Sequence, residues 1–206
     1  MMLAAWLSVS CAALAAPPAA DPAAAEKPAA EQHGAWTVIE SANFRLCAIA
    51  PRQTLDSLAA TCEATRQQLC RKWLGQGGDS SWTPKASTPK AWTPKCYIVL
   101  HPTAQSYLNE VGQEQMTAGS SLIEFEASRL VTRRIDLRAD HPQGYADALA
   151  HELTHVVVAE RFIERQIPRW ADEGMAVLAD GEIKQGLHLA DLSRARSQRT
   201  MFRMVE

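Results

Sequence analysis

Hydrophobic and polar positions along the chain change their spacing near residue 140. Before that point, short apolar runs bounded by turn residues predict β-strands, and one longer segment repeats its apolar residues at helical spacing. After that point the spacing is helical. The predicted strands cover residues 36–39, 44–49, 96–100, 122–125 and 130–137, and the predicted helices cover residues 53–74, 103–111, 145–161, 169–180 and a segment from about 188 to the end.

The order of these elements, strands first and helices last, predicts an α+β fold. We expect four or five strands to form a small mixed sheet that packs against the helices. A length of 206 residues suits one domain with its own core, which we place at residues 35–206. The chain stops at Glu206 without a helix-capping signal. We therefore also expect this domain to be incomplete at its C-terminal end.

The first 34 residues have the composition of an export signal followed by a spacer. Residues 1–16 are apolar and uncharged and run into small residues and prolines, which predicts a signal peptide and an exported protein, periplasmic or secreted. The segment is too short to cross a bilayer, so we expect no transmembrane span in the mature chain. Residues 17–34 are rich in Ala and Pro and predict a disordered linker. A lipid anchor on Cys11 and a frayed apolar terminus are the alternatives.

The balance of charge excludes whole classes of partner. Lys and Arg total 21 and Asp and Glu total 23, which gives a formal net charge of −2. No strong positive field attracts the chain to nucleic acid or to anionic lipid. Function must therefore reside in a local site.

Four cysteines, Cys47, Cys62, Cys70 and Cys96, remain after a signal peptide is removed. An even set in an exported protein predicts two disulfides. Cys62 and Cys70 lie eight residues apart in one predicted helix, a rise of roughly 12 Å, so each is expected to pair with Cys47 or Cys96. Four buried thiols are the alternative.

A short proline-spaced repeat lies between the first predicted helix and the third predicted strand. The sequence Trp-Thr-Pro-Lys occurs at residues 82–85 and again at 92–95. This pattern favours a loop expanded by local duplication, because it has no periodic core residues. A binding platform formed by Trp82 and Trp92 is the alternative.

The sequence HELTH at residues 151–155 lies within an apolar segment that predicts a helix. Residues four apart lie over one another on a helix, so His151 and His155 can bind one ion. Glu152 is rotated by about 100° from His151, which places its carboxylate where a general base can meet water. This pattern is typical of a catalytic zinc site.

A catalytic zinc ion takes three protein ligands and keeps one position open. The sequence PRWADEGMA, which begins at Pro168, predicts a second helix with two carboxylates near its start. Glu173 follows His155 by eighteen positions, enough for the chain to turn back toward the first helix. Glu173 is the expected third ligand, and Asp172 is the alternative.

The combination of HELTH with PRWADEGMA resembles the gluzincin metallopeptidases, the broad clan of thermolysin and the zinc aminopeptidases. The match covers residues 147–178 and is most similar to the bacterial peptidase MA-like proteins. The resemblance implies a zincin-like fold and one zinc ion held by His151, His155 and Glu173. It also implies that Glu152 is the general base.

The chain departs from this family pattern at two places. Thermolysin-like enzymes have a carboxylate four residues after the third ligand, where this chain has Val177, so Asp180 is the remaining candidate to orient His151. Related enzymes use a later Tyr or His to stabilise the oxyanion, but no Tyr follows Tyr145. His188 is the candidate for that role, and a solvated loop histidine is the alternative.

These features predict a zinc-dependent metallopeptidase that acts on peptides or proteins. The substrate motif Gly-x-Met-Glu-Asn of the aminopeptidases is absent, which favours an endopeptidase. The alternative is a catalytically inactive binding module that is stabilised by zinc. A structural site is expected to have a fourth protein ligand, and the chain retains Glu152, so the enzyme is favoured.

Overall fold

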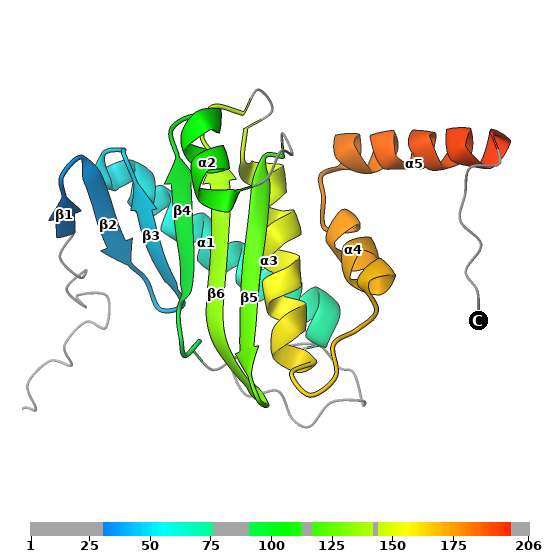
Figure 1. The fold of residues 1–206 in the computed structure, drawn as a ribbon, viewed down its shortest axis with the longest axis horizontal. Helices are drawn as coiled ribbons and strands as arrows, with labels where there is room; N and C mark the ends of the chain where they lie inside the picture. The colour runs from blue at the N-terminus through cyan, green and yellow to red at the C-terminus, as the bar shows by residue number, and fades with distance from the viewer. Residues whose placement is uncertain (1–30, 76–90, 113–116, 142–143, 199–206) are drawn as a thin grey trace, which may run out of the picture.

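The computed structural model describes residues 31–75, 91–112, 117–141 and 144–198 (Figure 1). The strands are β1 (Glu31–His33), β2 (Trp36–Glu40), β3 (Phe44–Ala48), β4 (Cys96–His101), β5 (Gly119–Glu126) and β6 (Arg129–Arg138). The helices are α1 (Arg52–Leu74), α2 (Ala104–Val111), α3 (Ala146–Arg161), α4 (Arg169–Val177) and α5 (Glu182–Ser197). The predicted α+β class and the order of strands before helices are confirmed.

The strands form one mixed sheet. Within the described residues it has six strands in the order β1-β2-β3-β4-β6-β5, so β5 is an edge strand. The pairs β3–β4 and β4–β6 are parallel, and the other neighbouring pairs are antiparallel. The sheet therefore has one strand more than the largest number predicted.

The additional strand is β1, which falls inside the predicted linker. Its residues pair with β2 in antiparallel register, with Glu31 opposite Val38. The linker prediction is wrong for residues 31–33 because backbone pairing with a neighbouring strand does not depend on apolar side chains. The rest of the linker, residues 17–30, lies outside the described residues, as do the predicted signal peptide and Cys11.

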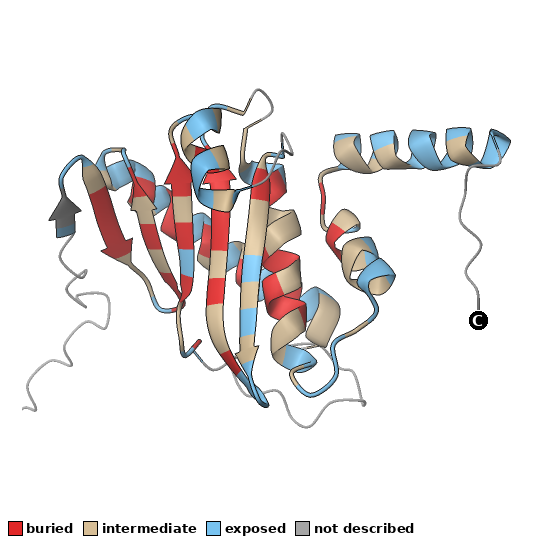
Figure 2. Ribbon diagram, in the orientation of Figure 1, coloured by how far each residue is buried: buried red, intermediate tan, exposed pale blue. Residues whose placement is uncertain are grey.

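Helices cover both faces of the sheet. α1 and α3 pack side by side on one face, and α2 covers β4 and β6 on the other (Figure 1). Strand residues alternate between the two faces, so Leu46, Ile98 and Ile135 all point into the core beneath α1 and α3. Figure 2 shows that buried residues concentrate in the central strands and in α3.

α3 is fixed by an apolar face that packs into this core. Leu149, Leu153, Val156 and Val157 recur at helical spacing and are at most 1% exposed. The side chains of HELTH that matter for chemistry lie on the remaining surface of the helix and are partly exposed. Packing of one face thus determines the direction in which the other face points.

After α3 the chain turns back, and α4 packs against α3. α5 extends away from the body of the molecule (Figure 1) and has no buried residue. It begins at Glu182, earlier than the predicted start near residue 188. Among the described residues, no helix combines the length and the apolar character needed to span a membrane.

The four cysteines among the described residues are free thiols, so the predicted pair of disulfides is wrong, and the alternative of buried thiols holds for three of them, because Cys47 is only partly buried. Cys62, Cys70 and Cys96 are at most 2% exposed and pack within the hydrophobic core. Burial raises the pKa of the Cys96 thiol to about 12, against a small opposing effect of Arg133. These cysteines act as small apolar core residues.

Trp92, from the second copy of the repeat, is a core residue and is 3% exposed. The guanidinium groups of Arg66 and Arg133 lie 4.4 Å and 4.9 Å from its ring centroid. Its indole nitrogen donates a hydrogen bond to Glu160 of α3. The alternative of an exposed aromatic platform is therefore wrong for Trp92, and Trp82 lies outside the described residues.

Candidate metal centre

α3 carries two of the predicted ligands one helical turn apart. The ring centroids of His151 and His155 are 5.2 Å apart. Both rings leave the helix on the side opposite the buried Leu153. The sequence spacing therefore brings two imidazoles to one place, as predicted.

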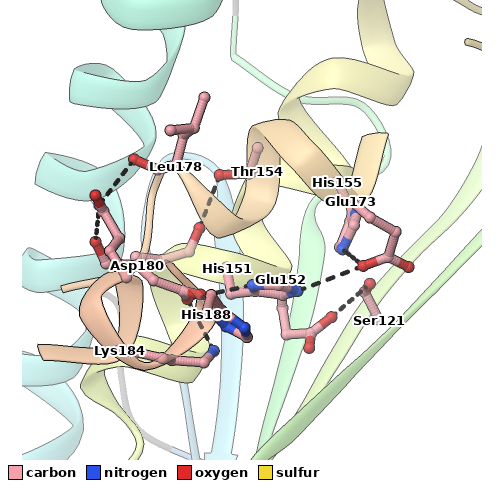
Figure 3. Close-up of polar contacts among 12 residues, drawn as sticks. Ser121, His151, Glu152, Thr154, His155, Glu173, Leu178, Asp180, Lys184 and His188 are labelled. Atoms are coloured by element: carbon pink, nitrogen blue, oxygen red, sulfur yellow. Dashed lines mark hydrogen bonds and ion pairs between the residues drawn. The ribbon is translucent and has the colours of Figure 1, made fainter. Parts of the chain in front are cut away.

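α4 brings Glu173 to these two rings. Its Oε2 lies 3.8 Å from Nε2 of His151 and 4.0 Å from Nε2 of His155 (Figure 3). One ligand atom from each residue falls within 4.8 Å of the others. The structure thus brings together the three residues that the sequence predicts as ligands.

The donor set and its spacing fit a zinc ion. Two imidazole nitrogens and one carboxylate oxygen are ligands of catalytic zinc sites. Ligand atoms 2.0–2.1 Å from a tetrahedral zinc ion are about 3.4 Å apart, closer than the 3.8 Å and 4.0 Å that separate Oε2 of Glu173 from the two histidine nitrogens. Glu173 is partly exposed, so the centre is open to solvent on its side.

Both imidazoles have a carboxylate at the opposite ring nitrogen. Nδ1 of His151 donates a hydrogen bond of 3.2 Å to Oδ1 of Asp180. Asp172 Oδ2 lies 2.9 Å from Nδ1 of His155, an ion-pair distance. Carboxylates in this position orient a histidine and keep its other nitrogen free for a metal. Asp180 therefore contacts His151, the histidine that it was predicted to orient. Asp172 lies at the opposite nitrogen of the His155 ring from Glu173, so it is not one of the three converging ligand residues.

Contacts between the histidines and these carboxylates shift the pKa values of His155 and Asp180. Burial by itself lowers the pKa of His155, but the nearby carboxylates of Asp172, Glu152 and Glu173 outweigh it and raise the pKa above the ordinary value. Burial by itself raises the pKa of Asp180, but hydrogen bonds from His151 and Lys184 outweigh it and lower the pKa. Asp180 is therefore held as a carboxylate.

Two residues of α5 complete the surroundings of Asp180, whose side chain is fully buried. Nζ of Lys184 donates a hydrogen bond of 2.8 Å to Oδ1 of Asp180. Nε2 of His188 lies 3.5 Å from Oδ2 of the same residue. His188 thus lies near Asp180, the carboxylate that contacts Nδ1 of His151. His188 is part of a helix, not of a loop.

Glu152 points from α3 toward the edge strand β5 (Figure 3). The hydroxyl of Ser121 donates a hydrogen bond of 2.8 Å to Oε2 of Glu152. A Cβ atom at Gly119 would lie 3.1 Å from Cγ of Glu152, so the absence of a side chain there lets the two elements approach. Neither Ser121 nor Gly119 was predicted as part of the site, because nothing in the sequence indicates which β5 residues face α3.

Two cavities adjoin the centre. One of about 540 Å³ reaches His155 and Glu173, and another of about 270 Å³ reaches His151 and Glu152. The centre therefore lies between two spaces that can receive parts of a bound molecule.

Comparison of the chain with protein-family models, with curated proteins and with solved structures gave no match. The functional assignment therefore rests on the residues and their geometry.

Proposed function

We propose that this protein is a zinc-dependent metallopeptidase of zincin-like fold. The observation that carries the proposal is the convergence of two Nε2 atoms and one carboxylate oxygen beside the carboxylate of Glu152. The resemblance of HELTH and PRWADEGMA to the gluzincins supports the same assignment. The proposal includes export, on the composition of residues 1–16.

His151, His155 and Glu173 would hold the ion. Zinc, when bound, polarises a carbonyl group and lowers the pKa of its water to about 7. The carboxylates at Nδ1 of the two histidines keep both Nε2 atoms directed at the same point.

Glu152 would move the proton during hydrolysis. The hydroxyl of Ser121 donates one hydrogen bond to its Oε2, which leaves the other lone pairs of the carboxylate to take a proton from water. The same carboxylate can then deliver this proton to the leaving amine of the cleaved peptide bond. A hydrogen bond that holds the carboxylate in one rotamer favours this transfer, because proton transfer requires close positioning.

The proposal is tested by metal analysis and by cleavage of a peptide library with the native chain, Glu152→Gln and the control Glu164→Gln. Glu164 is exposed, and its replacement removes the same charge away from the site. All three proteins should bind one zinc ion per chain, and only the native chain and the control should cleave peptides.

Two outcomes contradict the proposal. Equal turnover by Glu152→Gln removes the assigned base. Zinc binding without cleavage by any of the three proteins favours the zinc-stabilised binding module.

A further inference from the structure

The helix α2 carries a buried tyrosine that no step of the proposed hydrolysis uses. Tyr107 is 0% exposed, and its hydroxyl lies 2.9 Å from Oγ1 of Thr117, a hydrogen-bond distance. Burial raises the pKa of Tyr107, and hydrogen bonds from Thr117 and Ser120 act in the opposite direction. A protonated phenol can donate one hydrogen bond and accept another. Tyr107 thus connects α2 to the residues that open β5.

The first residues of β5 separate Tyr107 from Glu152, because α2 and α3 lie on opposite faces of the sheet (Figure 1). Successive side chains of a strand point to opposite faces. Gly119 and Ser121 face Glu152 of α3. Ser120, between them, faces Tyr107. A shift of these three residues away from α2 would therefore change the contacts of Glu152.

Tyr107 is held in place by a buried polar network on its own side of the sheet. Its ring packs edge-on against His101, with ring centroids 5.7 Å apart. Nε2 of His101 lies 2.8 Å from Oδ1 of Asp136, and both residues are buried. Arg134 donates hydrogen bonds to Asp136 and to Glu110 of α2. The phenol is therefore a fixed point from which β5 can be aligned.

Thr117 brings the same hydrogen bond to the space beside the proposed base. It is exposed, and with His151 and Glu152 it lines the cavity of about 270 Å³. Packing restrains an exposed side chain only weakly, so the hydrogen bond to the buried Tyr107 is the contact that restrains Thr117. One wall of this cavity is thus positioned from the other side of the sheet.

We propose that Tyr107 is a positioning residue of the candidate peptidase, which holds the first residues of β5 against Glu152 through its hydrogen bond to Thr117. The inference rests on the proposed function, in which Glu152 is the base. Tyr107 acts through β5 and does not reach the reacting atoms. Its loss should therefore misalign the base and leave the proposed ligands, which lie on α3 and α4, in place.

The test compares steady-state cleavage of one peptide by the native chain, Tyr107→Phe and the control Tyr97→Phe. The control removes the same atom from a tyrosine that is 46% exposed on β4. Tyr107→Phe should lower kcat by about three- to tenfold, the effect of one hydrogen bond, while KM changes less than about twofold. Its zinc affinity should equal that of the native chain. An unchanged kcat in Tyr107→Phe overturns the inference.

Variants of Thr117 separate the hydrogen bond from packing, and they serve even when Tyr107→Phe does not fold. Thr117→Val removes the same hydrogen bond at an exposed position and should lower kcat by a similar factor. Thr117→Ser keeps the hydroxyl and should retain most of the rate. Equal losses in the two variants overturn the inference.

The double variant Tyr107→Phe with Ser121→Ala tests whether both residues act on the same carboxylate. Its loss of kcat should be smaller than the product of the two single losses, because both changes release Glu152. Losses that multiply show that Tyr107 acts elsewhere and overturn the inference.

Hydrogen exchange of the backbone amides of Ser120 and Ser121 separates this inference from the proposed function, because it needs no turnover. Exchange should be faster in Tyr107→Phe than in Tyr97→Phe. Cleavage by the native chain with equal exchange in the two variants leaves the peptidase and removes the positioning role. Faster exchange without cleavage by the native chain supports the hold on β5 and contradicts the peptidase.

Discussion

His151 and His155 are each placed between Glu173 and a second carboxylate. Asp180 and Asp172 do not contact the proposed ion position, but they are the groups that select which ring nitrogen faces it. Asp180 has the stronger case for a structural role, because its side chain is fully buried and is shared with Lys184.

Replacement of Asp180 by Asn is expected to weaken zinc binding by roughly 10- to 100-fold, the range for carboxylates that support a metal-bound histidine. The amide keeps the size of the side chain but removes its charge. Zinc affinity can be measured by competition with a chelator. Asp191→Asn is the matched control, because Asp191 is exposed and pairs only with the exposed Arg194 among its described ion pairs. Equal affinity in both variants would contradict the role of Asp180.

Ser121→Ala is expected to lower kcat about tenfold, because it removes a hydrogen bond to a charged group, while KM stays within about threefold. Ser121→Thr keeps the hydroxyl and should restore most of the rate. The measurement is steady-state cleavage of one peptide at saturating zinc. Loss of rate in both variants would show that packing at β5, and not the hydrogen bond, is what matters.

The convergence of the proposed ligands was predictable because these residues are close in sequence. His151 and His155 are one helical turn apart, and Glu173 lies on the next helix, so no knowledge of the sheet is needed. Ser121 was not predictable, because its contact with Glu152 depends on which face of β5 meets α3. The position of Asp172 also depends on the docking of α4, which sequence spacing does not define.

At the scale of elements, α3 contributes both to the hydrophobic core and to the proposed metal centre. Its buried face packs on the sheet, and Glu160 near its end accepts a hydrogen bond from Trp92. The direction of HELTH is thus fixed at both the middle and the end of the helix.

Leu153→Ala should destabilise the protein by about 2–5 kcal/mol, because Leu153 is fully buried and its removal leaves a cavity. The free energy of unfolding can be measured by urea denaturation of the zinc-free chain. Leu189→Ala on α5 removes the same atoms from an exposed position. This change should alter the free energy of unfolding by less than about 0.5 kcal/mol. Similar losses in the two variants would contradict the described packing of α3.

The boundaries of most helices were predictable from apolar spacing, and α1, predicted at residues 53–74, occupies Arg52–Leu74. The strand β1 was not predictable, because its three polar residues form a strand only by pairing with β2. The disulfides were predicted from the even number of cysteines and from the expected export of the chain. Three of these cysteines are instead buried in the core.

The thiols provide a check on that packing. Burial raises the pKa of all four described thiols, Cys47 included, so the reactive thiolate is scarce at neutral pH and exposure of the sulfur determines the order of reaction. We expect an alkylating reagent at pH 8 to modify Cys47, which is only partly buried, well before the other three. Peptide mapping by mass spectrometry gives the order, and full modification in denaturant is the control. If two of these cysteines resist alkylation in denaturant without reductant, they form a disulfide, which would contradict the described thiols.

At the scale of the whole molecule, α5 is the least integrated element. None of its residues is buried, and its described hydrogen bonds to the rest of the chain come from Lys184 and Gln185 in its first turn. Exposed leucines, among them Leu187 and Leu192, follow along the helix.

A chain that ends after Gln185 should therefore unfold with a free energy within about 0.5 kcal/mol of the full chain. It loses His188, whose Nε2 lies 3.5 Å from Oδ2 of Asp180, but it keeps Asp180 and the shorter hydrogen bond from Lys184, so its zinc affinity should change little. Thermal and urea denaturation and chelator competition are the measurements. A chain that ends after Ala179 lacks Asp180 and should lose zinc affinity, which provides the contrast.

The proposed ligands, the base and both carboxylates behind the histidines lie within residues 151–180. These residues are joined by short loops, whose closure is a fast step in folding, but the direction of α3 is fixed by its packing on the sheet. The slow steps belong instead to the parallel pairing of β3 with β4 and of β4 with β6, whose partners are distant in sequence. Ser121 is the exception, since it reaches Glu152 from the sheet. The strands precede α3 and α4 in the chain, so during biosynthesis β5 and its Ser121 are made before the proposed ligands and the base that Ser121 contacts.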